Sequence, residues 1–286
     1  MDHAAVLDLF DRSMRRGAVA DAPGARVEHA GNVVRQVGVD AAAGAWEGVL
    51  WSDLDASTAD ADIAAQTAYA AALGREFEWK VYSHDRPRDL SDRLRAVGFV
   101  PEPPETLMVA ETAALSAADE PPAGVRLRAV ADEADIAALA DVHDEAFGGA
   151  LPPRLRLRLH AQLGAGAGAG AKAGAGAGAP AAGGTRTVAV LALADGRAVS
   201  AARMELVAGA PFAGLWGGGT APEWRGRGIY RALVAYRASR AAALGHRYVY
   251  ADASDLSRPI LARLGFSPLS ITTPHVLRPV GKDYPE

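Results

Sequence analysis

An internal repeat is the feature that most constrains how this 286-residue chain can fold. The segment AALG ends a helix-like run at 71–74 and again at 242–245, and an aromatic-rich strand follows at 77–82 and at 248–251. In both copies a helix-like stretch then ends in a Gly-Phe pair, and a last strand-like segment follows. The matching order predicts two copies of one α/β fold, fused in a single chain.

A break in composition separates the two copies. Residues 116–124 are rich in Pro, Ala and acids, a mixture that continues neither a helix nor a strand. We therefore expect a first domain at 1–115, a linker at 116–124 and a second domain at 125–286. A Gly-Ala tract at about 164–184 has no side chain large enough to repay the entropy of ordering it, so we expect a disordered loop there.

Charge and cysteine content narrow the classes of function. A net charge of -4 leaves no global basic field of the kind that sequence-independent nucleic-acid binding needs. The chain has no cysteine, and its seven histidines are scattered, so we expect no disulfide, no cysteine nucleophile and no metal site. The acidic start lacks the basic flank of a signal peptide, and the Gly-Ala tract is too weakly apolar to enter a bilayer. We expect a cytoplasmic protein without nucleic-acid or membrane partners.

The second half opens with a strand and an amphipathic helix. Apolar and polar residues alternate at 125–129, and apolar residues then recur at helical spacing. Beyond the Gly-Ala tract, expected strands at 187–194 and 197–207 flank an Asp-Gly pair, which is the turn chemistry of antiparallel hairpins. A third strand is expected around 212–216.

The chemistry lies in a glycine-rich turn between that third strand and a helix. Three glycines at 217–219 precede Arg-Gly-Arg-Gly at 225–228, and Ile229, Leu233 and Tyr236 then mark one apolar helix face. The first turn of a helix has unpaired amide donors and a partial positive charge, and glycines let a phosphate approach the backbone. The two arginines add formal positive charge, so the expected ligand contains a pyrophosphate.

Two common pyrophosphate motifs do not fit this turn. A P-loop would need Gly-Lys-Ser/Thr at its end, and a dinucleotide fold would need three spaced glycines with a later acid for a ribose. Neither pattern is present, so coenzyme A remains as the expected ligand.

Residues 222–233, PEWRGRGIYRAL, resemble the pyrophosphate-binding signature of the GNAT superfamily of N-acyltransferases. The resemblance continues through Ser254 and Ser257 to Leu-Gly-Phe at 264–266 and covers roughly 125–280. It implies an α/β (α+β) fold with two GNAT-like domains, each a mixed, mostly antiparallel sheet flanked by helices. It also implies acetyl-CoA as the acyl donor.

The resemblance assigns the cofactor site residue by residue. Amides from Arg225 to Tyr230 would hold the pyrophosphate, Thr220 and its neighbours would meet the pantetheine and acyl group, and Ser254 and Ser257 would lie near the thiol arm. The implied cofactor-binding residues are Gly219, Thr220, Arg225, Gly226, Arg227, Gly228, Ile229, Tyr230, Ser254 and Ser257.

Three positions depart from the family pattern. Tyr230 stands where Gly or Ala is usual, Ser254 where Asn is common, and Leu261 where a tyrosine often protonates the departing thiolate. That acid cannot be carried over to Leu261. General acid help contributes about 10²–10⁴-fold, but a thiol with a pKa of about 8.5 is a fair leaving group, so we expect slowed and not abolished activity.

A lysine-like amine must lose a proton before it attacks, so we sought a base. The candidate is Glu205 in the expected strand 197–207, with Tyr250 and His275 as further titratable groups. The competing interpretation makes Glu205 a solvent-facing strand residue and Tyr250 a core residue.

The first half lacks the glycine-rich turn. The corresponding segment, 54–62, is acidic and contains no glycine, so it should repel a pyrophosphate. Ser57 or Thr58 is expected to begin a helix there. The first half thus resembles a degenerate GNAT domain without a cofactor site. Its charged turn at 83–88 is either a substrate contact or a solvated loop.

Taken together, these observations predict an N-acetyltransferase that transfers acetyl from acetyl-CoA to a primary amine by direct attack. The expected acceptor is a small-molecule or peptide amine, with a protein lysine also left open, and pairing of edge strands offers a route to a homodimer. The alternative is a non-catalytic module that binds or senses acyl-CoA. A third class, a structural protein with two degenerate halves, requires the Arg-Gly-Arg-Gly turn to be incidental.

Overall fold

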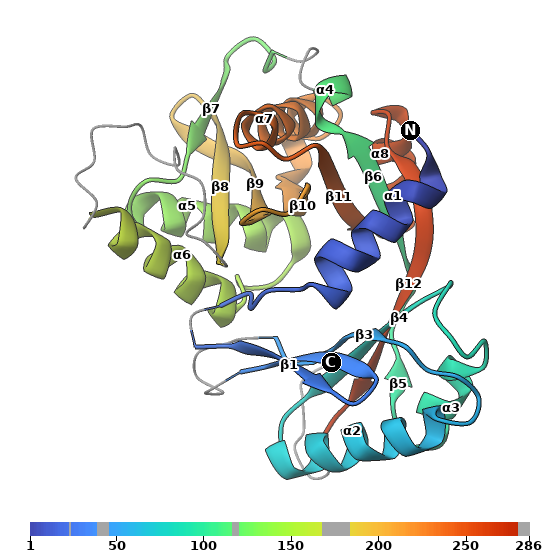
Figure 1. Cartoon of the computed structure of the whole chain (residues 1–286). Helices are drawn as coiled ribbons and strands as arrows, with labels where there is room; N and C mark the ends of the chain where they lie inside the picture. Colours follow the sequence, from blue (N-terminus) through green and yellow to red (C-terminus); the bar gives the residue numbers. More distant parts are fainter. Residues whose placement is uncertain (23, 39–45, 116–119, 168–183, 280–286) are drawn as a thin grey trace. The chain divides into compact units, whose positions relative to one another are not determined.

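The computed structural model describes residues 1–22, 24–38, 46–115, 120–167 and 184–279. The chain forms two compact units (Figure 1). Unit 1 contains Met1–Met108, Asp252–Pro259 and Pro268–Glu286, and unit 2 contains Val109–Ala251 and Ile260–Ser267. Within the described residues, no helix has the length and apolarity needed to cross a bilayer.

Unit 1 is a mostly antiparallel sheet with helices. Its strands follow the order β1-β2-β3-β4-β12-β6, β5 pairs with β12, and only β3 and β4 are recorded as a parallel pair. The strands are β1 (Arg26–Ala30), β2 (Val33–Val37), β3 (Gly48–Ser52), β4 (Phe77–Tyr82), β5 (Val100–Pro101), β6 (Glu105–Glu111) and β12 (Ser267–Leu277). The helices are α1 (His3–Phe10), the π-helical η1 (Asp11–Arg16), α2 (Ala59–Leu73) and α3 (Leu90–Ala96).

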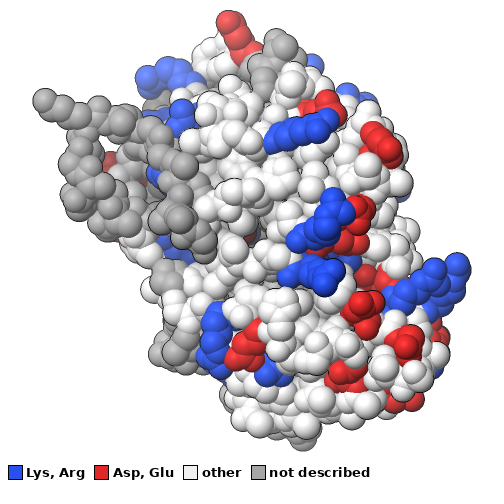
Figure 2. Space-filling view, viewed as in Figure 1, with Lys and Arg blue, Asp and Glu red and all other residues white. Residues whose placement is uncertain are grey.

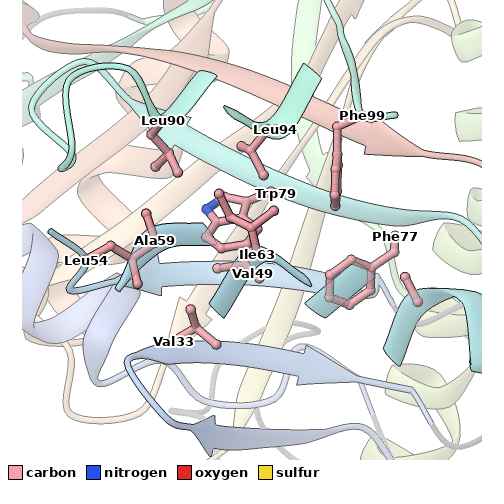
Figure 3. Packing of buried hydrophobic residues seen from close by; sticks show 11 residues of the cluster. Val33, Val49, Leu54, Ala59, Ile63, Phe77, Trp79, Leu90, Leu94 and Phe99 are labelled. Atoms are coloured by element: carbon pink, nitrogen blue, oxygen red, sulfur yellow. The ribbon is translucent and has the colours of Figure 1, made fainter. Parts of the chain in front are cut away.

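One face of the unit 1 sheet is covered by α2 and α3. Figure 3 shows Trp79 of β4 among Ile63 from α2, Leu94 from α3 and Phe99, all at most 2% exposed. The aromatic alternation of β4 explains this core, because successive side chains of a strand point to opposite faces.

The strands of unit 2 follow the order β11-β10-β9-β8-β7, and neighbouring strands are antiparallel except for the β10–β11 pair. The strands are β7 (Val125–Ala129), β8 (Thr185–Ala194), β9 (Arg197–Val207), β10 (Phe212–Thr220) and β11 (Tyr248–Ala253). The helices are α4 (Thr112–Leu115), α5 (Glu133–Phe147), α6 (Pro153–Ala167), the 3-10 helix η3 (Pro222–Trp224), α7 (Ile229–Ala243) and α8 (Arg258–Arg263). In Figure 1, α5 and α6 lie on one face of the β8–β9 hairpin and α7 on the other, and each face has its own apolar cluster.

Several local predictions are confirmed. β7 and β9 begin and end where expected, and β10 extends past the expected 216 to Thr220. The hairpin turn has Asp195 at φ 49° and Gly196 at φ 82°, the positive angles that a two-residue type I′ turn requires. The predicted fold class, a mixed and mostly antiparallel sheet with helices in both halves, is also confirmed.

The repeat is visible in the backbone. Gly74 and Gly245 follow the two Ala-Ala-Leu segments with φ of 61° and 89°, and Gly98 and Gly265 precede the two buried phenylalanines with φ of 100° and 98°. Each pair adopts the same left-handed conformation, which glycine reaches without steric cost.

The compact units differ from two consecutive halves of the chain. β12 is the last strand of the second copy, yet it pairs with β4 of the first, with Thr272 opposite Tyr82. Residues 252–259 and 268–286 accordingly group with unit 1. Part of the expected linker, 116–119, lies outside the described residues, so the boundary itself stays a prediction.

One expected boundary needs correction. The loop expected from Gly164 begins later, because α6 continues to Ala167; residues 168–183 lie outside the described residues. The predicted start of α2 is confirmed, since Thr58 is the residue that precedes the helix, but its side chain makes no capping hydrogen bond. The Asp55 carboxylate organises the turn before the helix, because its Oδ1 accepts from the amides of Ser57 at 2.7 Å and Thr58 at 3.0 Å.

Candidate functional site

The candidate site lies in unit 2, where β10 leaves its neighbour β11. The recorded register between these parallel strands runs only from Phe212–Tyr248 to Gly214–Tyr250. On its other side β10 stays paired with β9 to Thr220, with a bulge between Trp216 and Gly219. In the described register, the residues at the end of β10 thus have no partner on β11. An extended ligand can form backbone hydrogen bonds to this edge of β10, as an added strand would.

Close contacts explain two of the glycines at this strand end. A Cβ atom at Gly218 would lie 2.6 Å from Cε2 of Tyr230, and one at Gly219 would lie 2.7 Å from Cε2 of Phe147. Carbon atoms pack at about 3.5–4.0 Å, so only glycine fits at both positions. Aromatic rings from α7 and α5 therefore lie directly against the strand.

The start of α7 differs from the starts of α1 and α5. Asp2 caps α1 and Asp132 caps α5 with their side chains, whereas α7 begins at Gly228, with φ 83° and no side-chain cap. Gly226 is also left-handed, with φ 74°, and a Cβ there would meet nothing within 4 Å. The first turn of α7 thus keeps backbone amide donors without a side-chain cap, an arrangement suited to an anion.

The two arginines of this turn are tied to backbone carbonyls. Arg225 donates from Nε to the Thr220 carbonyl at 3.1 Å and from Nη2 to the Ala146 carbonyl at 3.1 Å. Arg227 donates from Nη2 to the Glu223 carbonyl at 3.0 Å, and its guanidinium lies 4.6 Å from the ring centre of Trp224. Both arginines are exposed, so they order the turn while their charge still acts beside it.

Ile229 and Tyr230 have different environments. The Ile229 side chain is 1% exposed in the cluster under α7, so only its amide is available to a ligand. Tyr230 lies over Gly218 and interacts with the guanidinium of Arg237, which is 1% exposed. Burial lowers the pKa of Arg237 to about 10, and its Nε and Nη1 donate to the carbonyls of Leu233 and Arg203.

Thr220 ends β10 beside a hydroxyl that sequence reasoning missed. Its Oγ1 lies 2.8 Å from Oγ of Ser200, which donates to the Gly219 carbonyl at 2.6 Å and is fully buried. Ser200 thereby fixes the strand end at which the resemblance implies pantetheine contacts. No local sequence pattern marks Ser200, because its role comes from its position opposite Thr220 in the β9–β10 register.

The structure brings Glu205 and Tyr250 to the two sides of Gly214. Gly214 pairs with Glu205 on β9 and with Tyr250 on β11. Arg158 of α6 donates to Oε1 of Glu205 at 3.0 Å, and Nε of Arg203 lies 3.7 Å from the same oxygen. The Glu205 side chain is 19% exposed, so it is neither a free surface carboxylate nor an isolated buried one.

Other predicted residues lie apart from this group. Ser254 is exposed and Ser257 is half-buried, with hydroxyl oxygens 3.3 Å apart, and both belong to unit 1, so their role beside a thiol stays a prediction. Leu261 is 1% exposed within α8 and offers no proton.

His275 is a buried residue of unit 1. Its Nδ1 donates to the Thr273 carbonyl at 3.0 Å, and its Nε2 lies 2.7 Å from the Ser91 hydroxyl. Burial lowers the pKa of this imidazole. Both ring nitrogens are therefore engaged inside unit 1.

The charged turn at 83–88 is held by unit 1 itself. Nη2 of Arg15 donates to both carboxylate oxygens of Asp85, at 2.8 and 2.7 Å, and His84 bonds to Asp11 and Ser270. These contacts give the turn an internal structural role. Figure 2 shows acidic and basic side chains interspersed on the visible face of the described residues, without one extended basic surface.

Neither a family model nor a curated protein matches the sequence. Solved structures do match the fold. A GCN5-related N-acetyltransferase from Kribbella flavida has a TM-score of 0.63 at 19% identity, over 98% of this chain and 95% of that one. A tandem GNAT protein from the clavulanic acid biosynthesis pathway has a TM-score of 0.61 at 14% identity, over 98% and 96%.

A third match, a GCN5-related N-acetyltransferase from Sphaerobacter thermophilus, has a TM-score of 0.57 at 16% identity, over 88% of this chain and 79% of that one. The first two matches span nearly the whole chain. The chain therefore has the tandem GNAT fold that its sequence resembles.

Proposed function

We propose that this protein is an acyl-CoA-dependent N-acetyltransferase whose second half binds acetyl-CoA and transfers the acetyl group to a primary amine. The observation that carries the proposal is the start of α7, where left-handed Gly226 and Gly228 leave an uncapped helix turn open. The amide donors and helix dipole of this turn suit the CoA pyrophosphate. The GNAT fold of the chain supports the same interpretation.

The unpaired edge at the end of β10 is the proposed place for the pantetheine arm and the thioester. Gly219 and Thr220 would bond to the arm as one strand bonds to another. Arg225 and Arg227 would contribute charge while they hold the turn in shape. A bulky group at Gly218 would close this edge, because Tyr230 already occupies the space above it.

The proposed chemistry is direct attack without a covalent enzyme intermediate. The amine nitrogen adds to the thioester carbonyl carbon, the C–S bond breaks, and the thiolate leaves and takes a proton from solvent. Glu205 is the proposed acceptor of the amine proton, and Tyr250 is the proposed group beside the leaving sulfur. General acid and base help of this kind is worth about 10²–10⁴-fold.

The first half is proposed to be a degenerate copy without a cofactor site. Its α2 begins with Asp60 and Asp62 in the first turn, and the Asp55 carboxylate occupies the preceding amides. Negative charge in this place favours the helix and opposes a phosphate. We retain 1–115, 116–124 and 125–286 as the proposed copy, linker and copy along the chain.

Calorimetric titration with acetyl-CoA tests the proposal, with two matched glycine variants. Gly228→Ala and Gly245→Ala both place a side chain at a left-handed residue, at opposite ends of α7. Each should cost about 1–2 kcal/mol of stability. Only Gly228→Ala should also lose acetyl-CoA affinity, because Gly245 is remote from the open turn.

The expected stoichiometry is one acetyl-CoA per chain, and a panel of amines should release free thiol above background. Binding without thiol release would replace the enzyme by an acyl-CoA-binding module. Absence of binding to the native protein, or equal binding by both variants, would refute the proposed site.

A further inference from the structure

Three side chains of unit 1 form a serine–histidine–aspartate arrangement. Nε2 of His84 lies 2.8 Å from Oδ2 of Asp11, and Nδ1 of the same ring lies 2.9 Å from Oγ of Ser270. Both distances are those of formed hydrogen bonds. A hydroxyl within hydrogen-bond reach of a base, with the base held by a third group, is the geometric signature of a serine nucleophile.

The β4–β12 pairing brings the serine to the histidine. The amide of Ser83 donates to the carbonyl of Ile271 at 2.8 Å, which continues the antiparallel register past the end of β4 and sets His84 opposite Ser270. Side chains of opposite residues are neighbours on one face of a sheet. Asp11 comes from η1, far away in sequence, so the arrangement follows no local motif.

The hydrogen bonds determine which ring nitrogen of His84 is the base. Burial opposes ionisation of Asp11, but the bond with His84 and the charge of Arg15 lower the pKa of this carboxyl. An ionised carboxylate only accepts, so Nε2 donates to it and Nδ1 accepts from the Ser270 hydroxyl. Nη1 of Arg15 lies 3.4 Å from Nε2, but it donates to Asp11 at the shorter distance of 2.8 Å.

The two nitrogens exchange roles compared with serine proteases, in which Nε2 contacts the serine and Nδ1 the aspartate. Either nitrogen of a neutral imidazole can accept a proton, so the base chemistry is the same. The ring is also held from the side, because Tyr82 packs edge-on against it with 5.7 Å between ring centres.

The surrounding charges favour proton uptake by the histidine. Arg15 bonds to both Asp11 and Asp85, so one guanidinium faces two carboxylates and the group keeps a net negative charge. Negative charge nearby stabilises the imidazolium that forms when a histidine takes a proton from a serine.

Two further donors lie next to the serine oxygen. Oγ of Ser83 is 3.1 Å from Oγ of Ser270, and the Ile271 amide donates to Ser83 Oγ at the long distance of 3.3 Å. Hydroxyl and backbone amide groups are the kinds of donor that stabilise the oxyanion of a tetrahedral intermediate. Ser83 and Ile271 are exposed, whereas Ser270 is only 8% exposed. This combination suits a small acyl group that approaches from the surface.

We infer that unit 1 contains an esterase site for short-chain acyl esters, with Ser270 as nucleophile and His84 as base. Asp11 is a positioning residue that acts through His84. This activity needs no CoA and is independent of the proposed acetyltransferase function.

The reaction is hydrolysis through an acyl-enzyme. Ser270 Oγ adds to the ester carbonyl carbon while its proton passes to Nδ1 of His84. The C–O bond to the alcohol breaks, and His84 returns the proton to the leaving oxygen. Water then attacks the acyl carbon with His84 again as base, the bond to Ser270 breaks, and the serine oxygen recovers its proton. The products are a carboxylic acid and an alcohol.

The first test uses the full chain with p-nitrophenyl acetate as substrate and diisopropyl fluorophosphate as a covalent probe. Mass spectrometry should find the probe on Ser270, and Ser270→Ala should abolish the label. His84→Gln should reduce both ester hydrolysis and labelling by about 10²–10⁴-fold.

Unit 1 offers a matched control in a second serine–histidine pair. The Ser91 hydroxyl lies 2.7 Å from Nε2 of His275, but Nδ1 of this ring bonds to the Thr273 carbonyl and not to a carboxylate. Ser91→Ala should therefore retain native hydrolysis and native labelling of Ser270.

A cysteine series tests the same site without ester turnover. Because the chain has no cysteine, Ser270→Cys and Ser91→Cys each introduce a single thiol. Alkylation of the Ser270→Cys variant by iodoacetamide should show a thiol pKa at least about one unit below the ordinary 8.5. Adding Asp11→Asn should raise that pKa, because the imidazolium loses its carboxylate, whereas a purely structural Asp11 would change only stability. Ser91→Cys should show no lowered pKa.

Labelling of Ser270 that is lost in His84→Gln would support the inference. Native hydrolysis by Ser270→Ala, or no labelling of Ser270 in the native protein, would overturn it. Urea unfolding shows whether each variant folds. If Ser270→Ala does not fold, the cysteine series decides, since an equal thiol pKa in Ser270→Cys and Ser91→Cys also overturns the inference. Failure of acetyl-CoA binding would leave these outcomes unchanged.

Discussion

A single methyl group at Gly218 should disturb the contact between β10 and α7. In Gly218→Ala the new Cβ would lie 2.6 Å from Cε2 and 3.4 Å from Cδ2 of Tyr230. Since carbon atoms pack at about 3.5–4.0 Å, the ring or strand must move by roughly 1 Å. The Tyr230 ring has little freedom to move, because it interacts with the buried Arg237. Overpacking of this kind costs about 1–3 kcal/mol.

A double-mutant cycle isolates this contact. Tyr230→Ala removes the ring, so a further Gly218→Ala change should be nearly neutral or stabilise by about 0.5–1 kcal/mol, since glycine weakens a strand. The coupling energy between the two positions is then expected to be about 1–3 kcal/mol. Gly149→Ala is the matched control, because a Cβ there meets nothing within 4 Å. It should be additive with Tyr230→Ala within about 0.5 kcal/mol.

Urea unfolding of the single and double variants, followed by circular dichroism and tryptophan fluorescence, provides the free energies of unfolding. The reasoning fails if Gly218→Ala costs the same with and without the Tyr230 ring. It also fails if the Gly149 control couples as strongly as Gly218, because the effect would then be unrelated to the contact.

Two further outcomes concern unit 1. Arg15→Met should destabilise the protein by about 3–5 kcal/mol in urea unfolding, because the Asp85 carboxylate, 5% exposed, loses its buried partner. The control is Arg12→Met, which removes an exposed ion pair and should cost less than about 1 kcal/mol. Equal losses of stability in the two variants would contradict the argument. Burial lowers the pKa of His275 below its ordinary 6.5, so the folded state binds fewer protons than the unfolded state, and stability should fall as the pH drops through about 6.5. In His275→Gln, the unfolding midpoint should depend less on pH between about pH 8 and 5. An unchanged pH dependence of the midpoint would show that His275 does not cause the loss of stability.

Local features of the site were accessible from sequence because their causes are local. The Asp-Gly hairpin turn and the glycine-rich start of α7 depend on backbone conformations that few residues adopt. The same holds for the repeated Gly74 and Gly245, which end α2 and follow α7. The resemblance to GNAT proteins added the expected ligand, and the fold matches support its architecture.

Other features depend on contacts between distant parts of the chain. The donors of Arg225 reach the carbonyl of Ala146, 79 positions away in sequence, and Glu205 meets Arg158, 47 positions away. Neither pair follows a local periodicity, so the sequence alone did not identify these partners. Ser200 was missed for the same reason, since its role arises from the β9–β10 register.

By itself, the sequence determined the repeated α/β pattern, the turn conformations, the uncapped glycine start of α7 and the absence of cysteine chemistry, because residue type and short-range spacing govern each of these. Only the tertiary structure decided that β12 joins the sheet of unit 1, that Tyr230 lies on Gly218, and that Ser200 bonds to the end of β10. The physical reason is that strand pairing and side-chain packing depend on which distant segments meet, and no local pattern encodes that choice.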